Sequence, residues 1–327
     1  MSSRSAPPSS FGTAAYGGDN WSPRVMPHAA EVGAIWAGHG VGSEWTTLRA
    51  VVMHRPGPEI AVSAADHDKV QMLAPLDLKR AQAQHDGIAA AYRSAGVEVH
   101  YVEPDNDPSD GAVQPNQMFC ADLMFMTPGG VILARPASTV RAGEERRVAR
   151  RLAALGVPIL RTLQGTATFE GADAMWLDPR TVIIARGLRT NDEGIRQVSA
   201  CLADQGVAVM AVDLPFGTMH LMGMLRIADR DLAICWPRRT PHAAVMALRE
   251  RGYRTEFLPD QEEAQANRAL NFVTLSPRRI LMVGGNPVTQ RFYEDLGIQV
   301  TATPADELAK AAGAIGCLTG VLGRGPA

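Results

Sequence analysis

The chain has 327 residues, of which 46% are hydrophobic and 20% are charged, so it can bury a substantial core. Its formal net charge of −2 gives no reason to expect a nucleic acid or an anionic membrane surface as a partner. No apolar run approaches the roughly 20 residues of a membrane span, which argues against a membrane protein.

The beginning of the chain predicts a flexible extension. Residues 1–44 are rich in Ser, Pro and Gly, show no sustained periodicity and lack the apolar core of a signal peptide. The four cysteines follow no CxxC spacing, which is typical of free thiols in a reducing compartment. We therefore expect a cytoplasmic protein with a single domain over residues 45–327.

Ordered elements are predicted from residue 48 onward. A strand over 48–54 precedes a helix over about 76–95, and a strand over 97–102 follows. A unit of two strands, a helix and a third strand then recurs. Its hairpins open near Asp122, Asp173, Met222 and Leu270, at intervals of about 50 residues. Such a period indicates repeated units that bury a common core.

One further interval leads to Cys317. There the chain supplies one predicted strand, over 317–322, and the other members of that unit are the elements at 48–102. Pairing the two ends of the chain in one unit would close a ring and remove exposed strand edges. The sequence therefore predicts an α/β fold, a five-bladed pseudo-symmetric propeller of ββαβ units.

In a closed ring, the starts of the hairpins face one central channel. Cysteine is a nucleophile as its thiolate, and histidine can transfer the proton of a leaving group. Several carboxylates beside them suit a planar cation such as a guanidinium. The residues predicted to converge on the channel are Asn116, Asp122, Glu170, Asp173, His220 and Cys317.

Other features favour ordinary structural roles. Cys120, Cys201 and Cys235 are interpreted as core residues, and Asp173 is explained equally well as the cap of a turn. The remaining histidines are scattered, and neither HxxxH nor CxxC spacing occurs. We therefore predict neither a metal nor a cofactor.

Four fragments together resemble the guanidine-modifying pentein superfamily, over residues 45–324. The superfamily includes arginine deiminase, dimethylarginine dimethylaminohydrolase and the amidinotransferases. The fragments are Pro115-Asn116 with Phe119 and Asp122, Phe169-Glu170-Gly171-Ala172-Asp173, Met219-His220-Leu221, and Cys317-Leu318-Thr319.

The resemblance implies a role for each matching residue. Cys317 would be the nucleophile and His220 the general acid and base, with Glu170 beside them in the catalytic set. Glu170 and Asp122 would hold the substrate guanidinium. The other substrate-binding positions are Asn116 and Asp173, with Arg141 and Arg189 on the substrate α-carboxylate.

Two departures bear on the substrate. Arginine deiminases typically carry Asp where this chain has Met222, and His where it has Gly316. Dimethylarginine dimethylaminohydrolases lack both, so the site pattern is closer to theirs.

The resulting hypothesis is hydrolysis of arginine or a methylated arginine to citrulline through a covalent thiouronium on Cys317. The alternatives are amidino transfer to an amine, plain arginine deimination, a non-catalytic pentein and a ligand-binding relic. The expected partner is a small guanidino compound, and a homodimer is left open.

Overall fold

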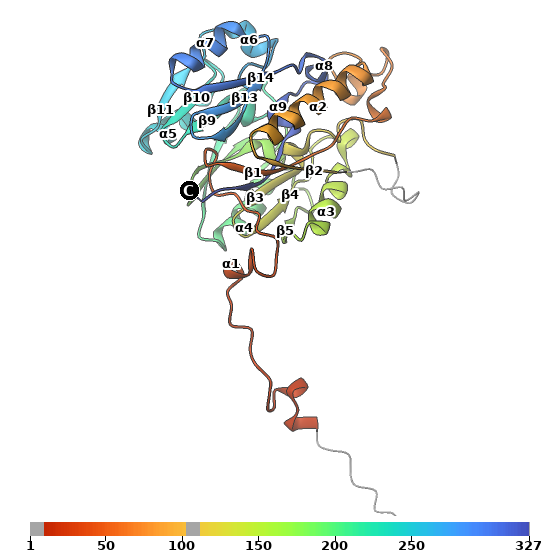
Figure 1. Cartoon of the computed structure of the whole chain (residues 1–327), viewed down its shortest axis with the longest axis vertical. Helices are drawn as coiled ribbons and strands as arrows, with labels where there is room; N and C mark the ends of the chain where they lie inside the picture. The colour runs from red at the N-terminus through yellow and green to blue at the C-terminus, as the bar shows by residue number, and fades with distance from the viewer. Residues whose placement is uncertain (1–9, 103–111, 327) are drawn as a thin grey trace, which may run out of the picture.

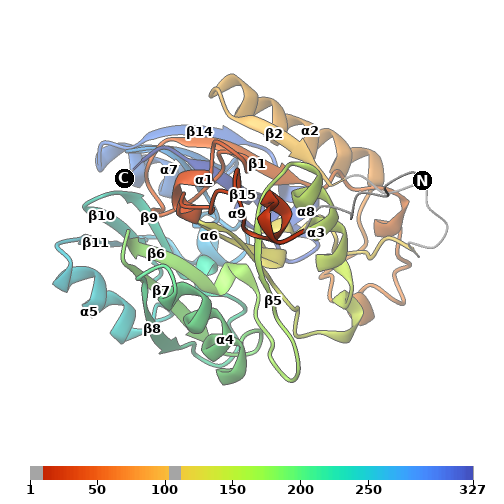
Figure 2. The same ribbon diagram turned by 90° about the horizontal axis from the view of Figure 1, so that it is seen from below.

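The computed structural model describes residues 10–102 and 112–326. Within them the strands form five three-stranded sheets. In each sheet the middle strand is antiparallel to one neighbour and parallel to the other. A parallel partner needs a crossover connection, which here contains a helix. Helices α2, α3, α4 and α5 lie outside the strands (Figure 2).

Four sheets each come from one continuous stretch of chain (Figure 1). Their strands are β3 (Met124–Thr127), β4 (Gly130–Leu133) and β5 (Ile159–Thr162); β6 (Ala174–Asp178), β7 (Thr181–Arg186) and β8 (Ala208–Asp213); β9 (Leu225–Asp229), β10 (Leu232–Cys235) and β11 (Arg254–Phe257); and β12 (Val273–Ser276), β13 (Arg279–Val283) and β14 (Gln299–Thr303). The crossover helices are α3 (Glu144–Ala154), α4 (Asp192–Ala203), α5 (His242–Glu250) and α7 (Pro287–Asp295). The predicted recurrence of strand, strand, helix and strand is confirmed.

The fifth sheet joins the first and last strands of the described chain. β1 (Leu48–Met53) is its middle strand, paired antiparallel with β15 (Gly320–Arg324) and parallel with β2 (Glu98–Tyr101). Helix α2 (Leu78–Ser94) makes the crossover from β1 to β2. The predicted pairing of the terminal strands in one unit is therefore confirmed.

Glycine ends the crossover helices. After α3, Gly156 has a φ of +75°, and after α4, Gly206 has a φ of +72°. This left-handed conformation favours glycine and turns the chain back toward the sheet.

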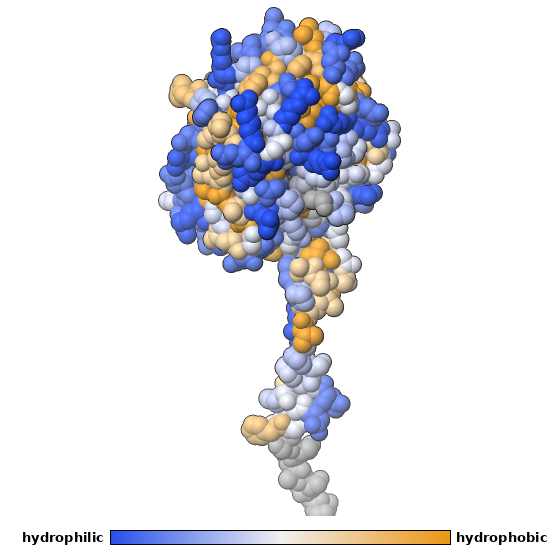
Figure 3. Space-filling view, turned by 90° about the vertical axis from the view of Figure 1, so that its left-hand side faces the viewer, coloured by the Kyte–Doolittle hydropathy of each residue, from blue (hydrophilic) through white to orange (hydrophobic). Residues whose placement is uncertain are grey.

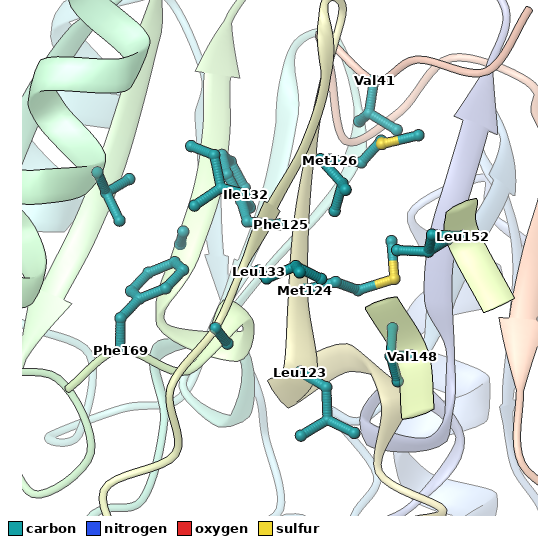
Figure 4. Packing of buried hydrophobic residues seen from close by; sticks show 14 of the residues in the cluster. Val41, Leu123, Met124, Phe125, Met126, Ile132, Leu133, Val148, Leu152 and Phe169 are labelled. Carbon is teal, nitrogen blue, oxygen red and sulfur yellow. The ribbon is translucent and has the colours of Figure 1, made fainter. Parts of the chain in front are cut away.

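The core lies where the sheets and crossover helices pack together. The middle strand β4 is buried along its length, whereas β5 is half exposed. Figure 4 shows part of the largest apolar cluster, in which Phe125 lies close to Phe169. Phe125 also stacks on Trp176, with ring centroids 5.8 Å apart.

The N-terminal segment divides into two parts. Residues 10–27 extend away from the body, and the chain then passes through α1 (His28–Glu31) to reach it (Figure 1). Residues 37–44 pack on the body: Ala37 N donates to Gly156 O at 3.0 Å, and Val41 is buried in the core. Hydrophobic surface gathers where the segment meets the body (Figure 3). Contacts with the body therefore begin before residue 45, although the domain boundary itself stays a prediction.

One local prediction was wrong. Cys317 was expected to open a strand, but it lies on the one-turn helix α9 (Ile315–Leu318), and β15 begins only at Gly320. Bonds from Leu318 N to Ala314 O and from Thr319 Oγ1 to Ile315 O hold this turn. Similar single turns precede three other first strands: η6 (Cys120–Leu123), η8 (Gly171–Asp173) and η9 (Leu221–Gly223). The strands after η6 and η9 begin two or three residues later than predicted, whereas β6 begins at Ala174, directly after the predicted Asp173.

Short helices occur elsewhere in the connections. They are η1 (Ser10–Gly12), η2 (Ala14–Tyr16), η3 (Pro58–Ile60), η4 (Asp68–Val70), η7 (Thr139–Arg141), α6 (Gln261–Gln265) and α8 (Asp306–Ala309). Among the described residues, no helix has the length and apolarity that crossing a bilayer requires.

Candidate active site

The single turns bring residues from distant parts of the chain to one pocket. The pocket has about 310 Å³ of empty volume, and Cys317 from α9 and His220 from the start of η9 stand in its wall. Four other predicted site residues also line it: Asn116, Asp122, Arg141 and Arg189. Glu170 and Asp173 are fully buried behind this wall.

His220 is held by carboxylates. Its Nε2 lies 2.7 Å from Glu170 Oε2, and its Nδ1 lies 3.8 Å from Asp122 Oδ1. Burial alone would lower the pKa of His220, but the charge of Asp122 and the hydrogen bond to Glu170 outweigh it and raise that pKa to about 9. His220 is therefore an imidazolium at neutral pH and can donate a proton.

Asp173 holds the backbone next to His220 in place. Its Oδ1 accepts a hydrogen bond from Leu221 N at 3.1 Å, and its Oδ2 accepts one from Thr190 Oγ1 at 2.7 Å. Burial raises the pKa of Asp173 to about 6. Since both oxygens are engaged and the side chain is absent from the pocket lining, the predicted role in substrate binding is not supported.

Arg141 occupies an unexpected position. Its Nη1 donates to Asp122 Oδ2 at 2.7 Å and to Glu170 Oε2 at 3.4 Å. Its Nε and Nη2 donate to Glu144 Oε2 at 2.9 and 2.8 Å. The two carboxylates expected to bind a substrate guanidinium thus already hold one from the protein, and Arg141 is less free for an α-carboxylate than predicted.

The charges of this cluster remain incompletely paired. Burial would raise the pKa of Glu170, but His220, Arg141 and Arg189 lower it to about 2. Asp122 Oδ1 is buried without a hydrogen-bond partner and belongs to a side chain that lines the pocket. It is the acceptor that a second guanidinium could use.

Arg189 is better placed than Arg141 to bind an anion. Its Nη1 makes a long contact of 3.3 Å with Glu170 Oε1, and its Nε is buried without a partner. It also lines the pocket. Its guanidinium can therefore receive a carboxylate.

Asn116 forms the wall rather than an open contact. Its Nδ2 donates to Val70 O at 2.7 Å, which fastens the segment that carries Gln71 to the pocket. Asn116 itself lines the pocket.

Cys317 lies beside two residues that the sequence did not identify. Asn271 donates from Nδ2 to the thiol Sγ at 3.2 Å and accepts from Gly316 N at 2.6 Å. The guanidinium of Arg226 lies so close that a Cβ on Gly316 would be 1.8 Å from its Nη2. A side chain at position 316 would therefore displace Arg226 or Asn271.

These neighbours act in opposite directions on the thiol. Burial and the charge of Asp122 raise the pKa of Cys317, whereas hydrogen bonds from Ala314 and Asn271 and the charge of Arg226 oppose the increase. The net shift is upward, so the resting nucleophile is a neutral thiol. A cation that binds beside it would promote ionisation.

The sequence analysis missed three site residues, two of which had weak signals in the sequence. Asn271 follows Leu270, where the fourth hairpin was predicted to open, and it is the equivalent of Asp122 and Cys317 by spacing. Arg226 interrupts an otherwise apolar strand. Glu144 had no signal, since its pairing with Arg141 depends on how η7 joins α3.

Asp122, Glu170 and His220 place potential metal-ligand atoms within 4.8 Å of one another. The guanidinium of Arg141 already contacts both carboxylates and supplies the positive charge that a metal ion would bring. This donor set therefore does not favour a metal, and the absence of one stays a prediction.

Comparison with protein families matches residues 63–276 to the model described as N,N dimethylarginine dimethylhydrolase, eukaryotic. Residues 255–324 match the arginine deiminase model. An N(G),N(G)-dimethylarginine dimethylaminohydrolase of Streptomyces coelicolor is 26% identical over 83% of this chain and 96% of its own. An arginine deiminase of Rhodococcus erythropolis is 23% identical over 88% and 98%, respectively.

Solved structures show the same fold at low sequence identity. The Pseudomonas aeruginosa dimethylarginine dimethylaminohydrolase complexed with citrulline has a TM-score of 0.69 at 20% identity, over 84% of this chain and 98% of that one. An amidinotransferase of Microseira wollei has a TM-score of 0.71 at 14% identity, over 89% and 98%.

Proposed function

Since the chain belongs to the N,N-dimethylarginine dimethylhydrolase family, we propose that it hydrolyses the guanidino group of an N-substituted arginine. The products are citrulline and an amine. The observation that carries this proposal is the pocket that holds the Cys317 thiol, the His220 imidazolium and the unpartnered Asp122 oxygen together.

The fold proposed for this activity is a pseudo-symmetric propeller with the five sheets as blades. Its support is the equivalent position of η6, η8, η9 and α9, each of which precedes the first strand of a sheet. The site residues come from these turns.

Charged groups at both ends of the first pocket's ligand bind the substrate. Asp122 Oδ1 accepts an N–H of the substrate guanidinium, and Arg189 binds the α-carboxylate. The guanidinium charge beside Cys317 lowers the pKa of the thiol, which opposes the effects of burial and Asp122.

The reaction then proceeds in two steps. The thiolate of Cys317 attacks the central guanidinium carbon, and His220 gives its proton to the departing amine. The resulting S-alkylthiouronium is attacked by water, whose proton returns to His220. The carbon–sulfur bond breaks, and the ureido product and the free thiol are released. Glu170 and Asp122 stabilise the imidazolium form of His220 in both steps.

Cys317→Ser tests this proposal. The purified protein and the variant are incubated with arginine, mono- and dimethylarginine and agmatine, and the ureido product is measured. We expect N-substituted arginines to be substrates of the unaltered protein, agmatine to be poor because it lacks the carboxylate for Arg189, and the variant to be inactive with an unchanged circular dichroism spectrum. Retained activity in the variant contradicts the mechanism.

Amidino transfer is the competing function, with an amine in place of water. Adding glycine or lysine with arginine and searching for ornithine together with a new guanidino compound separates the two. Action in the cytoplasm and a homodimer remain predictions.

A further inference from the structure

A second and larger pocket adjoins the reacting groups. It has about 990 Å³ of empty volume, compared with about 310 Å³ for the first. The two pockets share Met219, His220, Ala312 and Cys317 in their walls. The nucleophile and the proton donor therefore stand between two spaces, and a substrate attacked by Cys317 can extend into both.

The two pockets differ in charge. The first contains Asp122 and Arg189, a pair suited to an α-amino acid carrying a guanidinium. In the part of the chain that the structure describes, no carboxylate lines the second pocket, which instead has Arg239 and Arg268. The rest of its wall is largely apolar and includes Met222, Met224, Trp236 and Leu270.

Both arginines of the second pocket can accept an anion. The guanidinium of Arg239 lies over the Trp236 ring, 4.9 Å from its centroid, which limits its movement. Arg268 donates from Nη1 to Gln265 O at 2.8 Å, while its Nε is buried without a partner. Among the described residues, neither forms an ion pair with a carboxylate.

The size of the second pocket is excessive for a methyl group. A dimethylated nitrogen would leave most of this space to water and would not contact the two arginines. A longer substituent with a terminal negative charge would use both the apolar wall and the cationic groups.

We propose that the second pocket binds an anionic substituent on the reacting guanidine, so that the preferred substrates are Nω-carboxyalkyl arginines. This inference rests on the proposed function and specifies its leaving group. The ornithine portion lies in the first pocket and the carboxyalkyl group in the second.

The chemistry is the same hydrolysis with a different amine. Cys317 attacks the central carbon, the bond from that carbon to the substituted nitrogen breaks, and His220 protonates that nitrogen. Because His220 belongs to both pockets, the leaving nitrogen is next to the proton donor when its substituent occupies the second. With a carboxymethyl group and one water, the products are citrulline and glycine.

A pair of substrates tests the inference without altering the protein. Nω-(carboxymethyl)arginine and its neutral isostere Nω-(carbamoylmethyl)arginine differ in the charge of the substituent. Citrulline formation gives kcat/KM for each, with Nω-methylarginine as reference. We expect the carboxylate compound to be favoured about tenfold over the amide, as for partly exposed ion pairs to two arginines.

Variants then locate the preference. In the double variant Arg239→Gln with Arg268→Gln, the ratio of the two kcat/KM values should fall to about one, since the charge difference is no longer recognised. Arg238→Gln is the matched control, because Arg238 is exposed beside Arg239 and lines neither pocket. It should keep the ratio of the unaltered protein.

The outcomes separate this inference from the proposed function. A ratio near one in the unaltered protein, or a preference that survives the double substitution, overturns the inference even if methylarginine yields citrulline. If no guanidine yields a ureido product, the proposed function fails and this inference fails with it.

Discussion

At the residue scale, the thiol of Cys317 is influenced by a buried cation, Arg226, as well as by the carboxylate of Asp122. Arg226 is buried, stacks over Phe272 with its Cζ 5.8 Å from the ring centroid, and leaves Nε and Nη2 without hydrogen-bond partners. Burial lowers the pKa of Arg226, and the charge of Cys317 opposes that decrease. We infer that Arg226 supplies a positive charge next to the Cys317 thiol without contacting the substrate.

Arg226→Met should raise the pKa of Cys317. The test is the rate of alkylation of Cys317 by iodoacetamide, measured against pH. At a pH below the pKa of the thiol, this rate should be about tenfold lower in the variant than in the unaltered protein, which corresponds to an increase of one pKa unit. Arg249→Met on the exposed face of α5 is the control and should leave the titration unchanged. An unshifted titration in Arg226→Met would show that the buried charge has only a packing role.

The pH dependence of kcat/KM reports His220 and Cys317 together. The pKa of Cys317 is raised, so the thiolate fraction increases as the pH rises, and His220 loses its proton only as the pH passes about 9. Activity should therefore increase from pH 7 toward pH 9 and decline above it. A decrease between pH 7 and 9 contradicts these assignments.

Glu170→Gln provides a separate test of the imidazolium. The substitution removes the negative charge but can retain a hydrogen bond to Nε2, so the pKa of His220 should decrease. The alkaline limb of the profile should move to lower pH. Glu193→Gln on the surface of α4 is the control, since it contacts Arg196 rather than the site.

At the element scale, close backbone contacts between the single turns determine where the side chains lie. A Cβ on Gly171 in η8 would be 2.0 Å from Met124 O and 2.5 Å from Ala121 O, whereas one on Gly223 in η9 would meet nothing within 4 Å. The first contact involves backbone atoms that cannot move independently of β3.

Gly171→Ala should therefore destabilise the protein by about 3 kcal/mol or more, at the upper end of overpacking effects. Gly223→Ala should change the free energy of unfolding by less than about 0.5 kcal/mol. Urea unfolding of both variants measures the difference. Equal stabilities would mean that η6 and η8 do not constrain each other.

Local patterns predicted these elements better than their ends. Helix α4 begins at Asp192 because Asn191 caps it with a hydrogen bond from Gly194 N, and glycine ends each crossover helix. The run around Cys317 is small and apolar, which suits either a strand or a buried turn of helix. The choice depends on Asn271 and Arg226, which are distant in the sequence.

The candidate site was likewise predicted only in part from the sequence. The spacing of the repeated units was sufficient to predict that Asp122, His220 and Cys317 lie together, and all three line one pocket. It could not reveal that the guanidinium of Arg141 is held by Glu144, nor that Asp173 supports the backbone of Leu221. Both depend on side-chain directions after the turns have packed together.

At the scale of the whole molecule, the first and last strands of the described chain belong to one sheet, and residues 37–44 pack on the body beside it. Gly40 O accepts from Arg324 N at 3.0 Å, and Glu44 Oε1 accepts from Trp176 N at 3.0 Å. Val41 is buried in the core between these contacts. Residues 37–44 therefore contribute to stability, unlike residues 10–27.

Two truncations test this division. Removing residues 1–27 should leave Tm within about 1 °C, because the described part of that segment, residues 10–27, extends away from the body. Removing residues 1–44 should lower Tm by at least about 4 °C, since the burial of Val41 alone contributes roughly 1.5–3 kcal/mol. Equal Tm values for the two proteins would place the structural boundary at residue 45.

The most direct test of the proposed chemistry is to trap the covalent intermediate. A reaction with Nω-methylarginine is quenched with acid during turnover, digested with trypsin and analysed by mass spectrometry. We expect a substrate-derived adduct on the peptide that follows Lys310 and ends at Arg324, whose one cysteine is Cys317. Steady formation of citrulline with no adduct on that peptide, together with full activity of Cys317→Ser, would contradict the mechanism.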